Sequence, residues 1–381
     1  MPTTKGTGKK IQVGNRLIGP GEPIFLTGEI GVAHGGSFEN ARRLIHAAAE
    51  AGCDGVDIFM TDVEEFYYRN PPGQRDYFRE WHDQSFTPKQ WKELLAYGES
   101  LGLIVYPTPL DRHSIRLCGE IGVKMINLNS DDVNNLLLLE EAAGLGIPIT
   151  MHDIDQSLSE VEGAVRTLLD HGARDIIILH STQETGEQEF GYATANLKVM
   201  QTYEQAFGGL GVLAGCVEHT TSDYLIYAVA ALQPALISKH IKIDEQVESD
   251  RIIAVKIDEL KTMVQRVRAV EMALGSGQNQ KPVRSDGTAP QRSRNKVLVA
   301  ARDIPAGKRI DRDDIIAKRP GDFGGLHPWQ ARLLLGARAK APIGRNTLLS
   351  LNHFSDFPEP DYKFPETDNY PVADFNRVVG V

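Results

Sequence analysis

The sequence predicts a TIM (β/α)8 barrel followed by a small β-rich domain. Short apolar runs of strand length alternate with amphipathic helical stretches over about 250 residues, which is the pattern of such a barrel. The composition then changes: residues 276–295 are rich in Gly, Ser, Gln and Pro, and residues 296–354 return to short strands and turns. A doubly wound open sheet is the alternative for the first part, although no GxGxxG follows an early strand.

Each expected element follows from a local pattern. Apolar residues at helical spacing after Phe38 predict a helix that ends at Gly52, and Pro88 suits the first turn of another. Residues 61–84 are too long for a tight turn and should form an excursion over the barrel mouth. The expected strands cover residues 23–27, 54–60, 103–106, 125–128, 148–151, 175–179, 213–215 and 235–237. The expected helices cover residues 38–52, 87–102, 132–143, 158–169, 194–207, 223–232 and 254–274.

These patterns divide the chain into five parts. We expect an N-terminal tail (1–14), disordered up to residue 12, and then a barrel domain (15–275). A linker (276–295) leads to the β-rich domain (296–354), and a C-terminal tail (355–381) rich in Pro and Asp ends the chain.

Composition excludes several classes of protein. The net charge is −10, so we expect no binding to nucleic acid. The 3 cysteines show no CxxC spacing, which favours a reducing compartment over a disulfide framework. The first residues, MPTTKGTGKK, lack an apolar signal region, and no run approaches the roughly 18 apolar residues of a membrane span. We expect a cytoplasmic protein that does not associate with membranes.

Two histidines follow the last two expected strands. His219 comes after residues 213–215, and His240 comes after residues 235–237. Neighbouring strands of a parallel barrel present the residues at their ends to one mouth, and two neutral imidazoles there can hold a divalent transition metal. The alternative is that one histidine caps a strand and the other is exposed.

Polar residues follow the other expected strands as well. Because barrel enzymes place their chemistry at the carboxyl ends of the strands, this concentration predicts an enzyme. Glu29 is a candidate acid or base, with the alternative that it is a structural carboxylate paired with Lys239. The residues at these ends are Glu29, His34, Asp57, Thr108, Asp111, Asn127, Ser130, His152, Asp153, His180, Glu184, Glu218 and Lys239.

These motifs resemble those of the sialic acid synthases. Residues 29–37 read EIGVAHGGS, where the family usually has EIGxNHNG, and residues 108–111, TPLD, resemble its STPFD. Residues 128–136, LNSDDVNNL, resemble IASGDITNLPLL. His219-Thr220 and Lys239-His240 resemble the SDHT and EKH motifs.

The β-rich domain extends the resemblance. DIPAGKRI, at residues 303–310, and KRPG, at residues 318–321, are similar to the antifreeze-like (SAF) domain that follows the barrel in that family. The likeness therefore covers residues 11–354.

The resemblance implies a reaction and roles for residues. The family condenses phosphoenolpyruvate with an open-chain sugar aldehyde and releases phosphate. His219 and His240 would bind a divalent metal, Mn²⁺ or Mg²⁺ or else Zn²⁺, Fe²⁺ or Co²⁺. Glu29 would act as acid or base with His34 beside it, unless His34 only braces the first loop. A domain-swapped homodimer would bring Arg319 into the partner's barrel. By position, the substrate contacts would be Asp57, Thr108, Asn127, Ser130, His152, Glu184, Glu218 and Lys239.

The chain departs from the family where phosphoenolpyruvate would bind. Asp57 and Asn127 stand where the family has lysines that grip the phosphate and carboxylate, and His152 replaces a serine. Either the donor carries no phosphate, or another cation restores the charge, namely Lys124, Lys239, Lys242 or Arg112. We expect a metal-dependent C–C bond-forming synthase that uses phosphoenolpyruvate or a related three-carbon donor. The alternatives are a metal-dependent aldolase, lyase or isomerase on a non-phosphorylated substrate, and a non-catalytic sugar-binding homologue.

Some residues at the mouth have simpler explanations. His152 and Asp153 are either extra metal ligands or polar groups of the rim. We expect His180 to be a hydrogen-bonded core histidine, and Tyr67, Tyr68 and Trp81 to pack within the loop.

Overall fold

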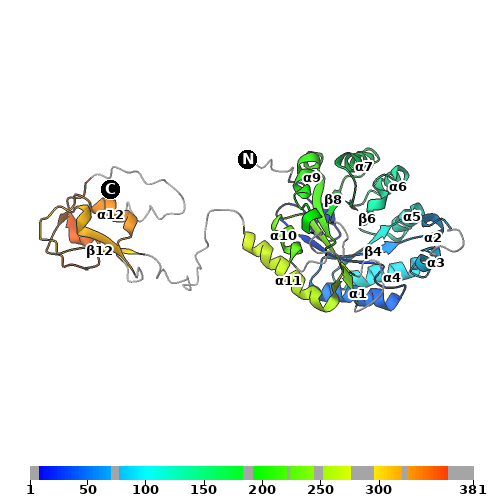
Figure 1. Ribbon diagram of the computed structural model, residues 1–381, viewed down its shortest axis with the longest axis horizontal. Coiled ribbons are helices and arrows are strands. Elements are labelled where there is room, and N and C mark those ends of the chain that lie inside the picture. The colour runs from blue at the N-terminus through cyan, green and yellow to red at the C-terminus, as the bar shows by residue number, and fades with distance from the viewer. Residues whose placement is uncertain are drawn as a thin grey trace. The chain divides into compact units, whose positions relative to one another are not determined.

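The computed structural model describes residues 8–69, 77–182, 192–220, 224–243, 252–275, 296–319 and 325–358. The chain forms two compact units, Met1–Ser276 and Gly277–Val381 (Figure 1). The linker (276–295) and most of the C-terminal tail predicted from composition lie outside the described residues.

The first unit is a parallel barrel that is nearly closed, as the alternating pattern predicted. Its strands pair in the order β5-β4-β3-β10-β9-β8-β7-β6, and the two end strands, β5 and β6, lie beside each other. A short strand, β11 (Val255–Lys256), pairs in parallel with the end of β10. The barrel strands are β3 (Phe25–Gly31), β4 (Gly55–Met60), β5 (Ile104–Pro109), β6 (Ile126–Leu128), β7 (Ile149–His152), β8 (Ile176–Ser181), β9 (Leu213–Glu218) and β10 (Leu236–Lys242).

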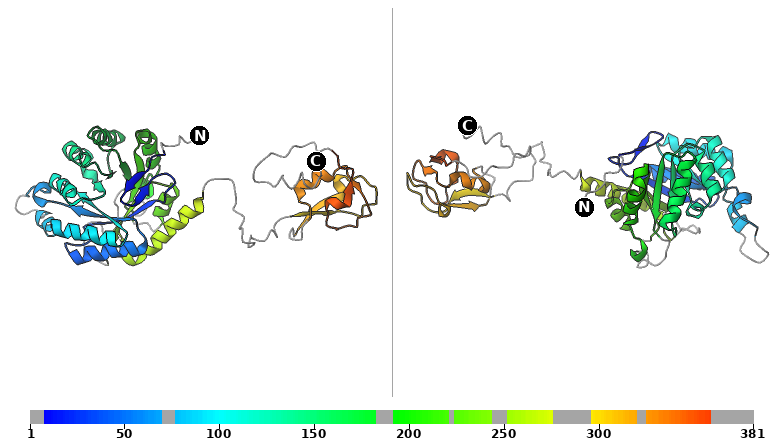
Figure 2. Two further views of the ribbon diagram at one scale, coloured as in Figure 1. Left: turned by 180° about the vertical axis from the view of Figure 1, so that it is seen from behind. Right: turned by 90° about the horizontal axis from the view of Figure 1, so that it is seen from above.

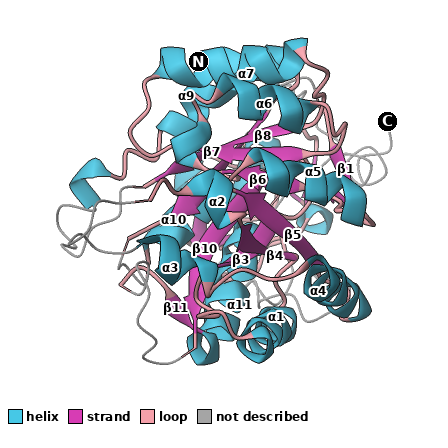
Figure 3. Cartoon of the chain, turned by 90° about the vertical axis from the view of Figure 1, so that its right-hand side faces the viewer, coloured by secondary structure: helices cyan, strands magenta, loops and turns pink. Residues whose placement is uncertain are grey.

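Helices surround these strands (Figure 3), and the further views in Figure 2 show the same arrangement. They are α1 (Phe38–Ala51), α4 (Pro88–Ser100), α5 (Arg112–Ile121), α6 (Leu136–Ala143), α7 (Leu158–Asp170), α9 (Val199–Phe207), α10 (Leu225–Ala231) and α11 (Ile257–Leu274). The helix expected from residue 132 begins at Leu136 instead, because the side chain of Asn135 caps its start. Gly52 ends α1 in the left-handed conformation, with φ of 89°, as predicted. Among the described residues, no helix is long and apolar enough to cross a membrane.

The long excursion after β4 contains two short helices. These are α2 (Val63–Phe66) and α3 (Tyr77–His82). Trp81 stacks on Phe59 and also contacts the rings of Phe66 and Tyr67. Tyr67 and Trp81 therefore pack within the loop as expected, whereas the side chain of Tyr68 is exposed.

Strand alternation produces two separate hydrophobic cores. Val56, Val105 and Ile241 belong to the core between the strands and the helices. Tyr106 and Leu236, on the opposite faces of their strands, belong to the core inside the barrel. Because successive side chains of a strand point to opposite faces, membership of one core or the other tells which residues face the interior of the barrel.

An N-terminal hairpin adds to the inner core. β1 (Ile11–Val13) pairs with β2 (Arg16–Ile18). The side chains of Ile11, Val13 and Ile18 are fully buried against the inner core, which also holds the first residue of β3. The expectation of disorder up to residue 12 is therefore wrong for Ile11 and Gln12, because two apolar residues in alternation were sufficient to fix a short strand.

The second unit has its own small core. β12 (Val297–Ala300) pairs with β13 (Ile315–Lys318), and β14 (Arg338–Ala339) pairs with β15 (Phe354–Ser355). A short helix, α12 (Ala331–Leu334), completes it. The side chains of Leu298, Ile310 and Phe354 are buried together, as expected for an independent β-rich domain.

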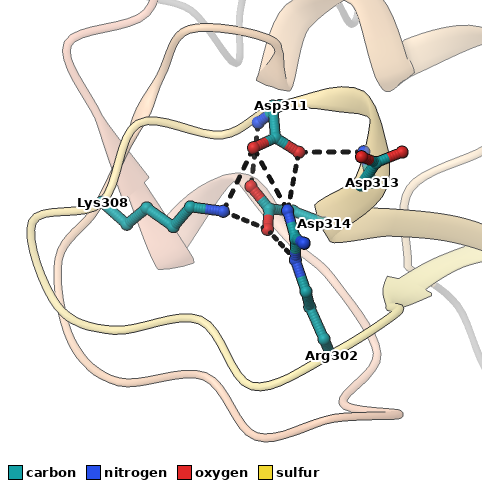
Figure 4. Close-up of polar contacts among 5 residues, drawn as sticks. All are labelled: Arg302, Lys308, Asp311, Asp313 and Asp314. Carbon is teal, nitrogen blue, oxygen red and sulfur yellow. Dashed lines mark hydrogen bonds and ion pairs between the residues drawn. The ribbon is translucent and has the colours of Figure 1, made fainter.

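A buried aspartate organises one turn of this unit (Figure 4). The Asp314 side chain is fully buried, and Arg302 Nε donates to its Oδ1 over 2.8 Å. Lys308 Nζ also contacts Oδ1, and the Asp311 backbone N–H donates to Oδ2 over 2.9 Å. Burial alone would raise the pKa of Asp314, but these donors outweigh it and lower the pKa to about 2.

Candidate active site at the barrel mouth

A layer of polar side chains lies inside the barrel at the carboxyl ends of its strands. The core inside the barrel contains one residue in, or directly before, each of four strands: Tyr106, Met125, Leu179 and Val217. The residue two positions after each of these also faces the interior. This alternation places Thr108, Asn127, Ser181 and His219 in the interior. By the same rule Glu29, Asp57, His152 and His240 join them, and all eight side chains are buried.

Glu29, His219 and His240 converge at this layer. Each offers a ligand atom, and these atoms all lie within 4.8 Å of one another. His240 Nε2 is 3.4 Å from Glu29 Oε1, and Ser238 Oγ donates to Glu29 Oε2 over 2.9 Å. Glu29 therefore contacts Ser238 and His240, and Lys239 finds another partner. The three residues come from β3, the end of β9 and β10, so distant parts of the chain build one cluster.

The spacing of the two imidazoles suits a shared metal ion. Their ring centres are 5.1 Å apart. With a metal–nitrogen bond of about 2.1 Å, two imidazoles on one tetrahedral ion have ring centres about 5 Å apart. The side chains present therefore fit a divalent transition metal held by the two nitrogens, with the Glu29 carboxylate beside it.

Thr182 fixes the proton of His219 on the nitrogen that faces away from the cluster. His219 Nδ1 is 3.1 Å from the Thr182 carbonyl oxygen, which can only accept, so Nδ1 carries the proton. Nε2 then carries a lone pair, and it is buried without a hydrogen-bond partner among the described residues. Burial, together with the nearby His240, lowers the pKa of His219 well below its usual value. The ring is therefore neutral, as a metal ligand must be.

His152 stands next to this cluster at the end of β7. Its ring centre is 6.4 Å from that of His219, and the planes cross at 70°. Nδ1 is 3.3 Å from Ser181 Oγ, and Nε2 is buried and unpaired among the described residues. Burial lowers the pKa of His152, so this imidazole is neutral as well.

On the other side of the mouth, four polar side chains bond to one another. Thr108 Oγ1 donates to Asp57 Oδ1 over 2.6 Å. Asn127 Nδ2 donates to Asp57 Oδ2 over 3.1 Å and to Thr108 Oγ1 over 2.9 Å. Thr150 Oγ1 donates to Asn127 Oδ1 over 2.7 Å. These residues, which we term the Asp57 network, join β4, β5, β6 and β7 across the place where the barrel is not closed by a ladder.

Within the described part of the chain, Asp57 has no cationic partner. Burial raises the pKa of Asp57 well above its usual value, and the neighbouring Glu29 raises it further, although Thr108 and Asn127 oppose this. Glu29 and Asp57 are paired in register on β3 and β4, so two carboxyl groups lie side by side.

Three of the four cations that could replace the missing lysines, Lys124, Lys239 and Arg112, are engaged elsewhere. Among the described residues, Lys239 is the only buried lysine or arginine. Its Nζ donates to Glu218 Oε2 over 2.6 Å and to the Thr220 carbonyl over 2.7 Å. Lys239 lies two positions from Ile237 and Ile241, and Glu218 lies two positions from Cys216, all of which belong to the core between the strands and the helices. Residues two positions apart share a face of the strand, so this ion pair lies on the side that faces the helices. Lys124 pairs with Glu99, and Arg112 pairs with Glu141.

The remaining predicted residues lie apart from the cluster or beyond the described chain. Ser130 is buried at the start of a short 3₁₀ helix, where its N–H donates to Asn129 Oδ1 over 2.8 Å. Glu184 lies outside the described residues, and Arg319 is exposed in the second unit. His180 bonds to the Ala195 carbonyl over 2.8 Å, which confirms that it is a hydrogen-bonded buried histidine.

His34 is buried beside the ring of Phe86. Its Nδ1 accepts the backbone N–H of Gly36 over 3.0 Å, so any proton on the neutral ring is on Nε2. Burial lowers the pKa of His34 to about 4. At neutral pH this side chain can therefore donate a hydrogen bond, but it is a poor source of a full positive charge.

Sequence reasoning missed three residues that hold the others in place: Thr182, Thr150 and Ser238. Thr182 holds His219 through both its carbonyl and its hydroxyl, which accepts the His219 N–H over 2.7 Å. The signal for Ser238 was present, since it precedes His240 by two residues and so shares its face of β10. Thr150 has the same relation to His152 on β7.

The chain thus combines a parallel barrel that has a polar layer at its mouth with a small β-rich unit, which is a two-domain barrel architecture. The chain belongs to the NeuB family, whose model matches residues 44–279, and a SAF domain model matches residues 295–355. The resemblance to the sialic acid synthases is thereby confirmed, together with the barrel and SAF architecture.

Individual relatives agree with this assignment. The chain is 26% identical to N,N'-diacetyllegionaminic acid synthase of Legionella pneumophila over 364 residues, which cover 91% of this chain and 99% of that protein. It is 27% identical to N-acetylneuraminate-9-phosphate synthase of Mus musculus, with 86% and 92% covered. The crystal structure of N-acetylneuraminic acid synthetase from Leptospira borgpetersenii matches with a TM-score of 0.65 and 25% identity, covering 72% of this chain and 93% of that one. These relatives are sialic acid-type synthases, which supports an enzymatic role in carbohydrate biosynthesis.

Proposed function

We propose that this protein is a divalent-metal-dependent transferase that forms a C–C bond between a three-carbon donor and an open-chain sugar aldehyde. The donor is phosphoenolpyruvate or a related molecule. The observation that carries the proposal is the convergence of Glu29, His219 and His240 within 4.8 Å in a buried layer at the barrel mouth. Such a cluster is costly to bury unless it binds a ligand. The sialic acid-type synthases among the relatives supply the reaction class.

The residues have distinct roles in this mechanism. His219 and His240 would hold the divalent ion, which would supply a Lewis acid for the carbonyl oxygen of the aldehyde, where negative charge develops during attack. His219 is oriented for binding by Thr182, and Ser238 holds one oxygen of Glu29 so that the other faces His240. Glu29 can therefore take or return a proton beside the ion. The buried position of the cluster keeps water away from a reactive enol.

The donor is held in an unusual way. Phosphate and carboxylate groups need hydrogen-bond donors or cations. The hydroxyl hydrogens of Thr108 and Thr150 and both amide hydrogens of Asn127 are used inside the Asp57 network. We infer that phosphoenolpyruvate, if it is the donor, binds weakly and through contacts outside this network.

The same observation supports an alternative. A metal-dependent aldolase, lyase or isomerase acting on a non-phosphorylated substrate would need the Glu29, His219 and His240 cluster but no phosphate site. A non-catalytic sugar-binding homologue would need the pocket but no acid or base. Products formed from each donor separate the first two functions, and any turnover excludes the third.

Assembly and location remain proposals. A domain-swapped homodimer would bring Arg319, which is exposed in the second unit, to the partner's barrel. We also propose a cytoplasmic location for the enzyme, as expected from the cysteine content.

Metal titration with product analysis tests the proposed function. The protein stripped with a chelator should bind about one ion of Mn²⁺, Co²⁺ or Zn²⁺ per chain, and the double variant His219→Ala/His240→Ala should bind none. Metal should restore formation of a keto acid from a sugar aldehyde plus phosphoenolpyruvate or pyruvate, monitored by mass spectrometry. Stoichiometric metal binding and full activity in the double variant would contradict the proposal.

A further inference from the structure

We propose that His152 is a third imidazole of the metal centre. The donor set would then be three histidine nitrogens, with the Glu29 carboxylate beside the ion as acid or base, which favours a transition metal over Mg²⁺. This inference rests on the metal centre of the proposed function and adds to it a ligand and a metal preference.

The position of His152 is the first support. It is the last residue of β7 and lies two positions after Thr150, whose hydroxyl bonds to Asn127 inside the barrel. Its side chain therefore faces the same interior as His219 and His240. Its exposed fraction is 3%.

The distance between rings is the second support. Given a metal–nitrogen bond of about 2.1 Å, two imidazoles on one ion have ring centres about 5 Å apart at a tetrahedral angle and at most about 6.5 Å apart on opposite sides of the ion. The rings of His152 and His219 are 6.4 Å apart, at the outer end of this range. His152 lies outside the group whose atoms are all within 4.8 Å, so the ring would move toward the ion on binding.

Hydrogen bonding is the third support. Nδ1 of His152 has Ser181 Oγ as a neighbour, whereas Nε2 is buried and unpaired among the described residues. An imidazole with one nitrogen held and the other left for the ion is the usual arrangement of a ligand histidine. His219 shows the same arrangement with Thr182.

The neighbouring carboxylate gives no alternative explanation for His152. Asp153 accepts the Ser181 N–H over 3.0 Å, and the Tyr203 hydroxyl bonds to its other oxygen. His180 Nδ1 is 3.7 Å from the same carboxylate. Asp153 is thus occupied by these groups, and the unpaired nitrogen of His152 is left for a ligand in the interior.

A third imidazole has a chemical consequence. Mg²⁺ prefers oxygen ligands and usually keeps several waters, whereas imidazole suits Zn²⁺, Co²⁺, Fe²⁺ and Ni²⁺. The centre should therefore bind Co²⁺ or Zn²⁺ far more tightly than Mg²⁺, and His152 should account for much of that difference.

Calorimetry on the full chain stripped of metal tests the inference. Co²⁺, Zn²⁺ and Mg²⁺ are titrated into the wild type, His152→Gln and the control His180→Gln, whose ring bonds to the Ala195 carbonyl instead. Because loss of a group that merely orients a ligand weakens binding about 10- to 100-fold, His152→Gln should lose about 100-fold or more for Co²⁺ and Zn²⁺. Mg²⁺ binding and the affinity of His180→Gln should change little. X-ray absorption on the Co²⁺ form should count one imidazole fewer in His152→Gln.

The outcomes separate this inference from the proposed function. If the wild type binds no metal, the metal centre itself fails. If it binds metal but His152→Gln matches it in affinity and in imidazole count, only the inference fails. An equal loss in His180→Gln would indicate a general disturbance and would also overturn the inference. Circular dichroism checks folding; if His152→Gln does not fold, His152→Cys takes its place and should retain Zn²⁺ through its thiolate.

Discussion

The two halves of the barrel mouth use their polar atoms in opposite ways. In the half formed by Glu29, His152, His219 and His240, two imidazole nitrogens are buried without partners among the described residues. In the Asp57 network, every hydroxyl and amide hydrogen of Thr108, Asn127 and Thr150 is donated to another member. The first half therefore has nitrogen atoms that can bind a ligand, whereas the hydrogen-bond donors of the second half are all used within the network. Under the proposed function, the first half would bind the metal, and the contacts that hold the donor would have changed in the second.

Two buried aspartates make the same point for charge. Asp314 in the second unit contacts Arg302 and Lys308, and its pKa falls to about 2. Asp57 in the barrel has neutral donors and a neighbouring carboxylate, and burial raises its pKa. The pH dependence therefore has opposite signs. Asp314 contributes stability above its ordinary pKa, whereas the contribution of Asp57 is present at low pH and is lost as pH rises through its folded pKa.

The largest expected effect is a loss of reaction rate when Glu29, in the half that contains the histidines, is replaced. Glu29→Gln keeps the shape and the bond from Ser238 but removes the proton acceptor, so the rate should fall about 10²- to 10⁴-fold. Steady-state kinetics with saturating metal measures this. Glu50→Gln, on the surface of α1, is the control and should retain the rate. An unchanged rate in Glu29→Gln would mean that another group moves the proton.

A smaller effect, on the affinity for phosphoenolpyruvate, is expected when positive charge is introduced into the Asp57 network. Asp57→Lys together with Asn127→Lys restores the lysines that the family resemblance implies for phosphoenolpyruvate. Each charge-assisted hydrogen bond contributes about 1.5 kcal/mol or more, so the affinity for phosphoenolpyruvate should rise about 100-fold. Titration calorimetry with metal present measures the change.

Asp57→Asn separates the two causes in that experiment, because it removes repulsion without adding attraction. It should give only a small part of the gain. Tight binding of phosphoenolpyruvate by the wild type, at micromolar level or below, would contradict the idea that this half has changed. No gain in the lysine variant would mean that the shape of the pocket, and not its charge, excludes the phosphate.

Much of the fold and part of the site could be predicted from the sequence. Apolar runs of strand length and helical periodicity were sufficient for the barrel, because each strand is buried on both faces. The pair His219 and His240 was found because both follow adjacent strands. Their contact with Glu29 could not be derived from spacing alone, since it depends on how β3 and β10 pair to complete the barrel.

Other features depend on which way a side chain points. Glu218 and Lys239 were predicted at the substrate site, but the structure places them as an ion pair toward the helices, one residue out of phase with His219 and His240. Counting alternation along β10 would have shown this for Lys239. The Asp57 network was beyond sequence reasoning, because its bonds link residues up to 70 positions apart.

The smallest expected effect is on the stability of the second unit and concerns Asp314, which contacts Arg302 and Lys308. Its pKa of about 2 in the folded protein lies below the ordinary value of 3.8, so the folded unit holds the carboxylate ionised. Its contribution, about 2 kcal/mol, is present above pH 3.8 and is lost as pH falls toward 2. Hydrogen exchange of the β12 and β13 amides, referred to intrinsic rates at each pH, should show this loss. Asp314→Asn should abolish the pH dependence and lower protection at pH 5, whereas Asp313→Asn, an exposed neighbour on the same turn, should not. If both variants behave as the wild type, Arg302 and Lys308 do not stabilise the buried carboxylate.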